Sequence, residues 1–271
     1  MTVFDHVQKE DLQKLKGCIQ QEPTSLYEQL RLTKLGVTLI LYTSGKLLLQ
    51  GSPQHIKSLL PELEKHHIGQ KQSSQHFTQE TGIIIGSDES LKGDTFGGIV
   101  VAAVKADNDT RKKLKELGVA DSKTLSDTEI LPLAEKIKHL VPCEIISLLP
   151  EEYNNYLIHH NITHLLNKLH DDCARYLKPG KHIVDKYPGC QAGNNCEEKA
   201  ESKYVEVAAA SILARAAALH QLNYLSSLAG FTLPKGSTHV LPAVEELKKR
   251  NHSFAQFIKV DFKNVKEFLK K

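Results

Sequence analysis

The sequence has no tryptophan, a single methionine and only 6% aromatic residues in 271 positions. Such a chain has few of the large aromatic side chains on which nucleic-acid bases stack, so it does not suit a binding protein that relies on stacking. It also lacks any run of about 20 apolar residues, the length needed to cross a bilayer. The N-terminal region is charged and holds no long apolar core, which argues against a secretory leader. We therefore expect a cytoplasmic protein without a membrane partner.

Cysteine is scarce and irregularly spaced. The five cysteines are odd in number and form no CxxC pair, which argues against a disulfide framework. Cys190 and Cys196 flank a short loop and could approach each other, but no further histidine or cysteine pair completes a zinc set. We expect reduced thiols in a reducing compartment.

Neither sign of charge dominates, since the net charge is +3 with histidine neutral. This balance is compatible with a nucleic-acid partner but does not require one. The distribution is more informative, because residues 245–271 hold eight Lys or Arg against four acids. Such a segment suits a polyanion, although a solvated, Lys-rich terminal helix has the same composition.

The pattern of polar and apolar residues divides the chain into two domains. Residues 1–68 predict a small α+β domain with a helix at 5–20, strands at 37–42 and 46–50, and a helix from 52 to about 66. Residues 69–80 are polar and rich in Gln and Ser, which indicates a linker. From residue 81 to 271, strands and helices alternate, which predicts an α/β sheet with flanking helices.

Within the second domain, apolar runs predict a strand at 83–85 with a hairpin partner at 98–104, and further strands at 143–148 and 182–185. Helices are expected at about 109–117, 127–139, 151–159 and 162–177. A long Ala-rich stretch from about 199 to 228 has high helix propensity and predicts one continuous helix.

Four acids occupy the positions where strands and helices of such a sheet converge. Asp88 and Glu89 follow the apolar run at 83–85, Asp185 ends the strand at 182–185, and Glu201 lies near the start of the Ala-rich helix. Carboxylates packed together repel one another and are kept ionised by divalent cations. Oxygen ligands select hard ions such as Mg²⁺ or Mn²⁺, and two such ions can promote phosphodiester cleavage.

Each acid also has an ordinary structural interpretation. Asp88 and Glu89 could form a solvated acidic hairpin turn, and Asp185 could begin the turn before Tyr187. Glu201 could be a first-turn acid favoured by the helix dipole. Only the set of four together favours a metal site.

Several segments resemble, in order, the motifs of bacterial ribonuclease HIII. They are GSDESLKGDTFG at 86–97, DSKTL at 121–125, IVDK at 183–186, KAES at 199–202 and AAASILAR at 208–215. The hairpin at 41–47 resembles the TATA-binding-protein-like domain that precedes the catalytic domain in this family. The related ribonuclease HII generally lacks that domain and has an aspartate where this chain has Glu201.

The resemblance implies a ribonuclease-H-like mixed sheet, preceded by the TATA-binding-protein-like domain in residues 1–68. It implies a monomeric, metal-dependent endonuclease that cuts the RNA strand of RNA–DNA hybrids and leaves 5′-phosphate and 3′-hydroxyl ends. The resemblance assigns catalysis and the binding of two Mg²⁺ or Mn²⁺ ions to Asp88, Glu89, Asp185 and Glu201.

Substrate contacts are expected mainly from the turn after the first two acids. The resemblance implies that the turn follows the minor groove, where the 2′-hydroxyls that distinguish RNA are exposed. The expected contact residues are Ser90, Leu91, Lys92, Gly93, Ser122, Lys123 and Lys235, with Tyr42 and Lys46 in the N-terminal hairpin. Lys123 alone would read as a solvated loop lysine, and Lys235 lies in what could be an ordinary polar turn.

Two residues depart from the family pattern. Leu91 stands where the family usually has glycine, and leucine does not adopt a positive φ as easily, so the turn must differ or be strained there. Gly98 stands in place of a proline. Neither change removes a predicted metal ligand.

Three other functions would explain parts of the pattern. A ribonuclease HII-like enzyme would act on single ribonucleotides embedded in DNA. A non-catalytic hybrid-binding protein would use the acids structurally, and a metal phosphatase would turn over small phosphate esters without regard to a 2′-hydroxyl.

Overall fold

The computed structural model describes residues 2–4, 7–66, 68, 77–78, 80–119, 122 and 125–269. The chain divides into two compact units, residues 1–74 and 75–271. The predicted linker at 69–80 lies largely outside the described residues. Of its described residues, Thr78 donates hydrogen bonds from its backbone N and from Oγ1 to the carbonyl of Lys203 in the second unit.

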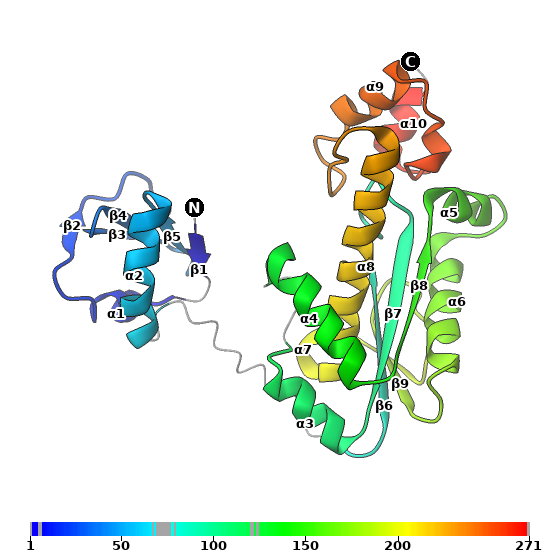
Figure 1. Ribbon diagram of the computed structural model, residues 1–271, viewed down its shortest axis with the longest axis horizontal. Coiled ribbons are helices and arrows are strands. Elements are labelled where there is room, and N and C mark those ends of the chain that lie inside the picture. The colour runs from blue at the N-terminus through cyan, green and yellow to red at the C-terminus, as the bar shows by residue number, and fades with distance from the viewer. Residues whose placement is uncertain are drawn as a thin grey trace. The chain divides into compact units, whose positions relative to one another are not determined.

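The N-terminal unit is an antiparallel sheet with a helix packed against it (Figure 1). Its strands, in the sheet order β1-β5-β4-β3-β2, are β1 (Thr2–Phe4), β5 (Leu47–Gln50), β4 (Val37–Tyr42), β3 (Glu28–Lys34) and β2 (Ile19–Gln21). Helix α2 (Pro53–Lys65) begins as expected, with Pro53 in its first turn and the Ser52 side chain accepting from the backbone N of His55. Its Leu59 and Leu63 are buried in the core of the unit, together with apolar residues of β4 and β5.

The predicted helix at 5–20 is wrong. Only a short helix, α1 (Lys9–Leu12), forms in this segment, and residues 5 and 6 lie outside the described ones. Gly17 takes a positive φ of 74°, which redirects the chain, and the next residues pair with β3 as strand β2. Leu12 and Leu15 are buried as a helical face would predict, but Ile19 is 70% exposed.

The second unit is built on a five-stranded mixed sheet in the order β10-β9-β6-β7-β8. The strands are β10 (Asn195–Glu197), β9 (Lys181–Asp185), β6 (Ile84–Ser90), β7 (Ile99–Ala106) and β8 (Cys143–Leu148). Central strand β6 runs antiparallel to β7, as the predicted hairpin requires, and parallel to β9. The sheet confirms the predicted α/β class, and β8 has the predicted bounds.

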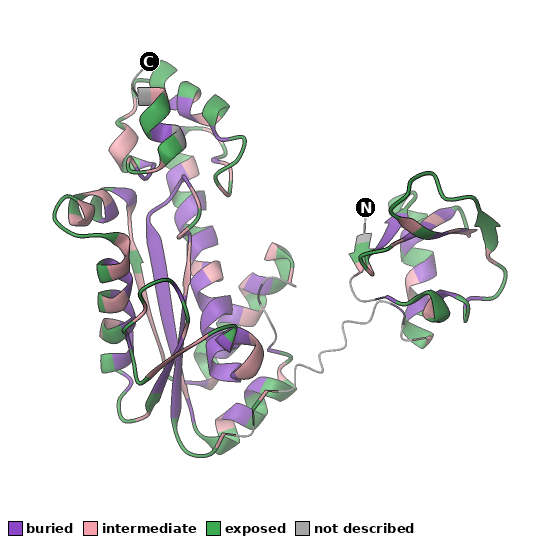
Figure 2. Ribbon diagram, turned by 180° about the vertical axis from the view of Figure 1, so that it is seen from behind, coloured by how far each residue is buried: buried purple, intermediate pink, exposed green. Residues whose placement is uncertain are grey.

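Helices cover both faces of this sheet (Figure 1). One layer contains α3 (Asn108–Glu116), α4 (Asp127–Leu140), α7 (Ala200–Lys203) and α8 (Val205–Ala229), and the other contains α5 (Pro150–Leu157) and α6 (Ile162–Arg175). Helix α8 is buried along most of its length, as Figure 2 shows. Gly86 allows its close approach to β6, because a Cβ there would lie 2.4 Å from the backbone N of Val207. A buried ion pair between Arg111 and Glu206, 2.6 Å long, joins α3 to α8.

The Ala-rich stretch does not form the single helix expected from its composition. Tyr204 takes an extended backbone conformation and separates α7 from α8. Its hydroxyl donates to Oε1 of Glu197 in β10, so a contact outside the helix overrides the local propensity. The break leaves Glu201 on the short helix α7.

The C-terminal part of the chain comprises α9 (Leu241–Lys249), the 3₁₀ helix η2 (Phe254–Gln256) and α10 (Lys263–Leu269). Lys259, one of the eight basic residues expected to face solvent or a polyanion, is instead fully buried. No helix in the described part of the chain is both long and apolar enough to cross a membrane.

The expectation of five reduced thiols is also wrong. Cys190 and Cys196 form a disulfide across the loop between β9 and β10. Cys18, Cys143 and Cys173 remain free.

Candidate active site

Asp88 and Glu89 lie within β6 and face opposite sides of the sheet, because successive side chains of a strand alternate. Asp88 faces the layer of α7 and α8. Glu89 faces α6, on the same side as Ser87, and its Oε2 lies 3.4 Å from Nε2 of His170. Alternation therefore gives two neighbouring acids two different environments.

Asp88, Asp185 and Glu201 form a carboxylate cluster. Each offers an oxygen, and these atoms all lie within 4.8 Å of one another. Asp185 ends β9 beside β6, and its Oδ1 accepts a 2.7 Å hydrogen bond from the backbone N of Ala200, which brings the start of α7 to the strand. Glu201 is the next residue after Ala200 in α7, so the hydrogen bond to Ala200 and the helix break at Tyr204 together place the third acid.

Burial and mutual repulsion disfavour the ionised forms of Asp88 and Asp185. Burial raises the pKa of Asp88 well above its usual range, and the charges of Glu89, Asp185 and Glu201 add to the shift, while a hydrogen bond from Ser211 opposes it. Burial, followed by the charge of Glu201, raises the pKa of Asp185 to about 6. A cation among these oxygens would reduce the repulsion and favour the ionised forms of Asp88 and Asp185.

Glu89 lines the same cleft but is not part of the three-acid cluster. Its Oε1 accepts a 2.9 Å hydrogen bond from Nζ of Lys92. Burial acts to raise the pKa of Glu89, but the contacts with His170 and Lys92 outweigh it, and the net shift is downward. Protein groups therefore already compensate the charge of Glu89.

His170 belongs to a buried polar chain on the α6 side of the sheet. Ser87 Oγ lies 2.7 Å from Nδ1 of His170 and 2.7 Å from Nε2 of His182. These histidines lie 83 and 95 positions from Ser87, so the sequence carries no local signal of the contact.

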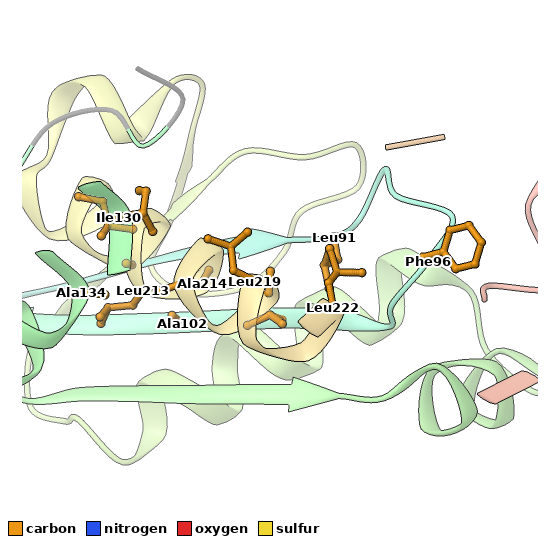
Figure 3. Close-up of a cluster of buried hydrophobic side chains, with 14 of the residues drawn as sticks. Leu91, Phe96, Ala102, Ile130, Ala134, Leu213, Ala214, Leu219 and Leu222 are labelled. Atoms are coloured by element: carbon orange, nitrogen blue, oxygen red, sulfur yellow. The ribbon is translucent and has the colours of Figure 1, made fainter. Parts of the chain in front are cut away.

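The β6–β7 turn (residues 91–98) forms one side of the cleft. Leu91 adopts a φ of +68°, so the expected strain at this position is present. Its side chain is 5% exposed and lies beside Leu219 and Leu222 of α8 (Figure 3). Apolar burial thus offsets an unfavourable backbone conformation. Gly98 donates its N–H to Oε1 of Gln221 at 2.8 Å, a bond that the family's proline could not make.

The remaining predicted substrate residues fall into different places. Ser90, Lys92, Gly93 and Ser122 line the cleft. Lys123 lies outside the described residues. Lys235 does not line the cleft and pairs instead with Asp127. Tyr42 and Lys46 lie in the β4–β5 hairpin of the N-terminal unit, where the backbone N of Tyr42 donates to the carbonyl of Lys46.

Two cleft residues on α8 were not assigned a role from sequence. Ser211, which sequence alone explained by helix packing, lines the cleft and bonds Ser122 at 2.7 Å between the two Oγ atoms. Arg215 also lines the cleft, and its guanidinium donates to the carbonyl of Ser122 and to Asp127. Both residues lie in the segment at 208–215 that carried the family resemblance. They are one helical turn apart and therefore share a helical face, which was the sequence signal that could have placed them together in the cleft.

Comparisons with known proteins agree with this geometry. The family model described as Ribonuclease HII matches residues 85–265. Ribonuclease HIII of Streptococcus agalactiae serotype III is 36% identical over 227 residues, covering 75% of this chain and 74% of that protein. Ribonuclease HIII of Bacillus subtilis is 32% identical over 269 residues, with coverage of 86% and 84%.

Solved structures give the same result. The crystal structure of Bst-RNase HIII in complex with Mn²⁺ matches with a TM-score of 0.65 and 26% identity, and covers 99% of this chain and 98% of that one. Aquifex aeolicus RNase H3 matches with a TM-score of 0.59 and 26% identity, over 96% and 99% of the two chains.

The mixed sheet, the buried carboxylate cluster and these matches define a nuclease of the ribonuclease H type. Among such nucleases, the chain belongs to the ribonuclease HIII family.

Proposed function

We propose that this protein hydrolyses the RNA strand of RNA–DNA hybrids with two divalent ions, Mg²⁺ or Mn²⁺, and leaves 5′-phosphate and 3′-hydroxyl ends. The observation that carries the proposal is the position of the carboxylate cluster. Three acids with oxygens within 4.8 Å of one another open into a cleft whose wall is the β6–β7 turn. A reactive phosphate and the ribose beside it can be reached from one cleft.

The donor set fits hard divalent ions. It consists of carboxylate oxygens, two of the three acids are buried, and burial raises the pKa of Asp88 and of Asp185, which supports a cation as their partner. We assign metal binding to Asp88, Asp185 and Glu201, with Glu89 as the fourth ligand from the other side of the strand. Bound there, two divalent ions would activate a water and stabilise the leaving 3′-oxygen.

The chain's own residues hold and orient the reacting groups. Asp88, fixed by strand β6 and by its hydrogen bond from Ser211, supplies one carboxylate of the cluster. The backbone of residues 90–93 is proposed to read the 2′-hydroxyl, since a shallow minor groove exposes that group to a turn. Ser122, Lys123 and Lys235 are proposed to contact the substrate backbone.

The N-terminal unit is proposed to increase the grip on the hybrid. Residues 1–68 would form the substrate-binding domain, with contacts from Tyr42 and Lys46, and residues 81–271 the catalytic domain, joined by a linker at 69–80. Basic residues of the C-terminal helices would add a salt-dependent phosphate contribution. We propose that the protein acts as a monomer, which light scattering on the purified protein would test.

Asp88→Asn provides the main test. It removes one charge from the carboxylate cluster while keeping shape, so cleavage in Mg²⁺ or Mn²⁺ should fall to below about one hundredth of the parent rate. Binding to a hybrid should remain. Asp109→Asn is the matched control, since it removes an exposed acid in the first turn of α3 and should leave cleavage unchanged. Wild-type cleavage by Asp88→Asn would refute the proposed site.

The choice of substrate separates hybrid cleavage from its nearest alternative. The rates of cleavage of a continuous RNA–DNA hybrid and of a DNA duplex with one embedded ribonucleotide should be compared under the same conditions. The 36% identity to a ribonuclease HIII favours the hybrid. Preference for the single ribonucleotide would instead support a ribonuclease HII-like activity.

A further inference from the structure

Lys259 is a buried lysine whose amine has an unusual set of partners. Its side chain is fully buried, and Nζ donates to three backbone carbonyls, those of Leu91 at 2.8 Å, Asp94 at 2.6 Å and Gly97 at 3.0 Å. In its protonated form the amine has three donors, and these three bonds use all of them; burial lowers the pKa of Lys259 to about 7. All three acceptors belong to the β6–β7 turn. Burying a charge is costly unless it is fully hydrogen-bonded, so this arrangement ties the state of the turn to Lys259.

The surrounding chain holds Lys259 in register with the turn. Residues 254–260, the C-terminal segment, pair with the turn through an antiparallel bridge between Phe96 and Ile258. The backbone N of Gly97 donates to the carbonyl of Phe257, and that of Lys259 donates to the carbonyl of Thr95, each at 3.0 Å. The C-terminal segment thus holds the turn both through its backbone hydrogen bonds and through the side chain of Lys259.

A residue on α5 anchors the C-terminal segment in turn. Asn154 Nδ2 donates to the carbonyls of Ala255 and Ile258, and its Oδ1 accepts from the backbone N of Val260. Asn154 contacts only the segment that carries Lys259 in these bonds, and none of them reaches the turn. It therefore offers a way to loosen Lys259 from a distance.

The turn needs such support because of Leu91. A leucine at a φ of +68° is disfavoured relative to a glycine, and without external bonds the turn would relax toward other conformations. The carbonyl of Leu91 is one of the three acceptors of Lys259. Lys259 therefore bonds the strained residue directly.

We propose that Lys259 is a positioning residue that holds the β6–β7 turn in the conformation that distinguishes an RNA–DNA hybrid from a DNA duplex. This inference rests on the proposed function, because it assumes that residues 90–93 read the ribose. Lys259 does not touch the substrate. It fixes the carbonyls on the inner side of the turn, and so fixes the direction in which the outer backbone groups face the cleft.

Lys259→Met tests the inference, since methionine approximates the shape of the lysine stem and removes all three donors. The substitution is made in the cleavage-deficient Asp88→Asn background, and affinities are measured for a hybrid and for a DNA duplex of the same sequence. The preference for the hybrid should fall about tenfold, equivalent to about 1.4 kcal/mol. Affinity for the DNA duplex should stay within about twofold, because phosphate contacts elsewhere are retained.

Lys112→Met is the matched control. It removes the same charge from a side chain that is 79% exposed on α3, and it should leave the preference unchanged. An unchanged preference in a folded Lys259→Met protein would overturn the inference, as would an equal loss of affinity for both duplexes. Folding is checked by circular dichroism.

If Lys259→Met does not fold, Asn154→Ala decides the matter. It removes no group that bonds the turn directly, but it loosens the C-terminal segment and with it Lys259, so the hybrid preference should fall by about threefold. No change would overturn the inference. Failure of the proposed function would be visible separately. The parent protein would then not cleave the hybrid, and the Asp88→Asn protein would not bind the hybrid in preference to DNA.

Discussion

Replacing Leu91 by alanine and, separately, by glycine will measure the free energy cost of the left-handed backbone in the β6–β7 turn. Both variants lose a side chain that is 5% exposed and packs against α8, a change that costs about 2–5 kcal/mol in a typical core. Alanine keeps the φ of +68° unfavourable by about 1–2 kcal/mol, whereas glycine adopts it freely. We expect Leu91→Gly to be more stable than Leu91→Ala by about 1 kcal/mol.

The control is the same pair of substitutions at Leu219, in the interior of α8. There the order should reverse, with glycine less stable than alanine by about 1 kcal/mol. Urea denaturation followed by far-UV circular dichroism suits the measurement, because the chain has no tryptophan and most of its helices lie in the second unit. If Leu91→Ala is at least as stable as Leu91→Gly while Leu219 behaves normally, the backbone of Leu91 carries no cost and the reasoning fails.

Three further outcomes are expected. Arg111→Met should lose about 3–5 kcal/mol in urea denaturation because it leaves Glu206 buried without its partner, and adding Glu206→Gln should recover part of the loss; no loss would contradict a buried ion pair. Burial lowers the pKa of His182 to about 3, so below about pH 6.5 the unfolded chain takes up a proton that the folded chain does not. Between about pH 7.5 and 5.5 the free energy of unfolding should therefore fall by about 1.4 kcal/mol. Melting curves of His182→Gln, measured over the same pH range, should lack this loss of stability. Mg²⁺ or Mn²⁺ should raise the melting temperature of the parent protein more than that of Asp88→Asn, and equal shifts would argue against the carboxylate cluster as the binding site.

Elements with a clear hydrophobic period were predictable. The strands at β4 and β8 and helices such as α2 and α4 combine apolar spacing with caps or turn residues, and the structure confirms them. Strand β3 was not predicted, because Leu30 and Leu32 alternate with polar residues over too short a run to stand out. The helix expected at 5–20 failed for the opposite reason, since a helical apolar pattern was overridden by Gly17 and by pairing with β3.

The candidate site was predictable where residues adjoin in sequence or follow a family motif. Asp88, Asp185 and Glu201 meet as expected, but their geometry depends on a break at Tyr204 that helix propensity hides. The histidines bonded to Ser87 could not be found from sequence, because a buried histidine has no local signature.

The shape of the β6–β7 turn is a property of the whole catalytic unit rather than of its motif. The motif alone predicts that leucine in place of glycine at position 91 makes the turn differ or strains it. In the folded chain, a Cβ on Gly97 would lie 2.9 Å from Cδ1 of Leu91, so the absence of that side chain gives the leucine its room. Leu222 packs against it from α8, and Lys259, 168 positions away, bonds its carbonyl. Because these three contacts act on one residue, a leucine can hold the left-handed conformation that glycine would adopt unaided, and the backbone that faces the cleft remains defined.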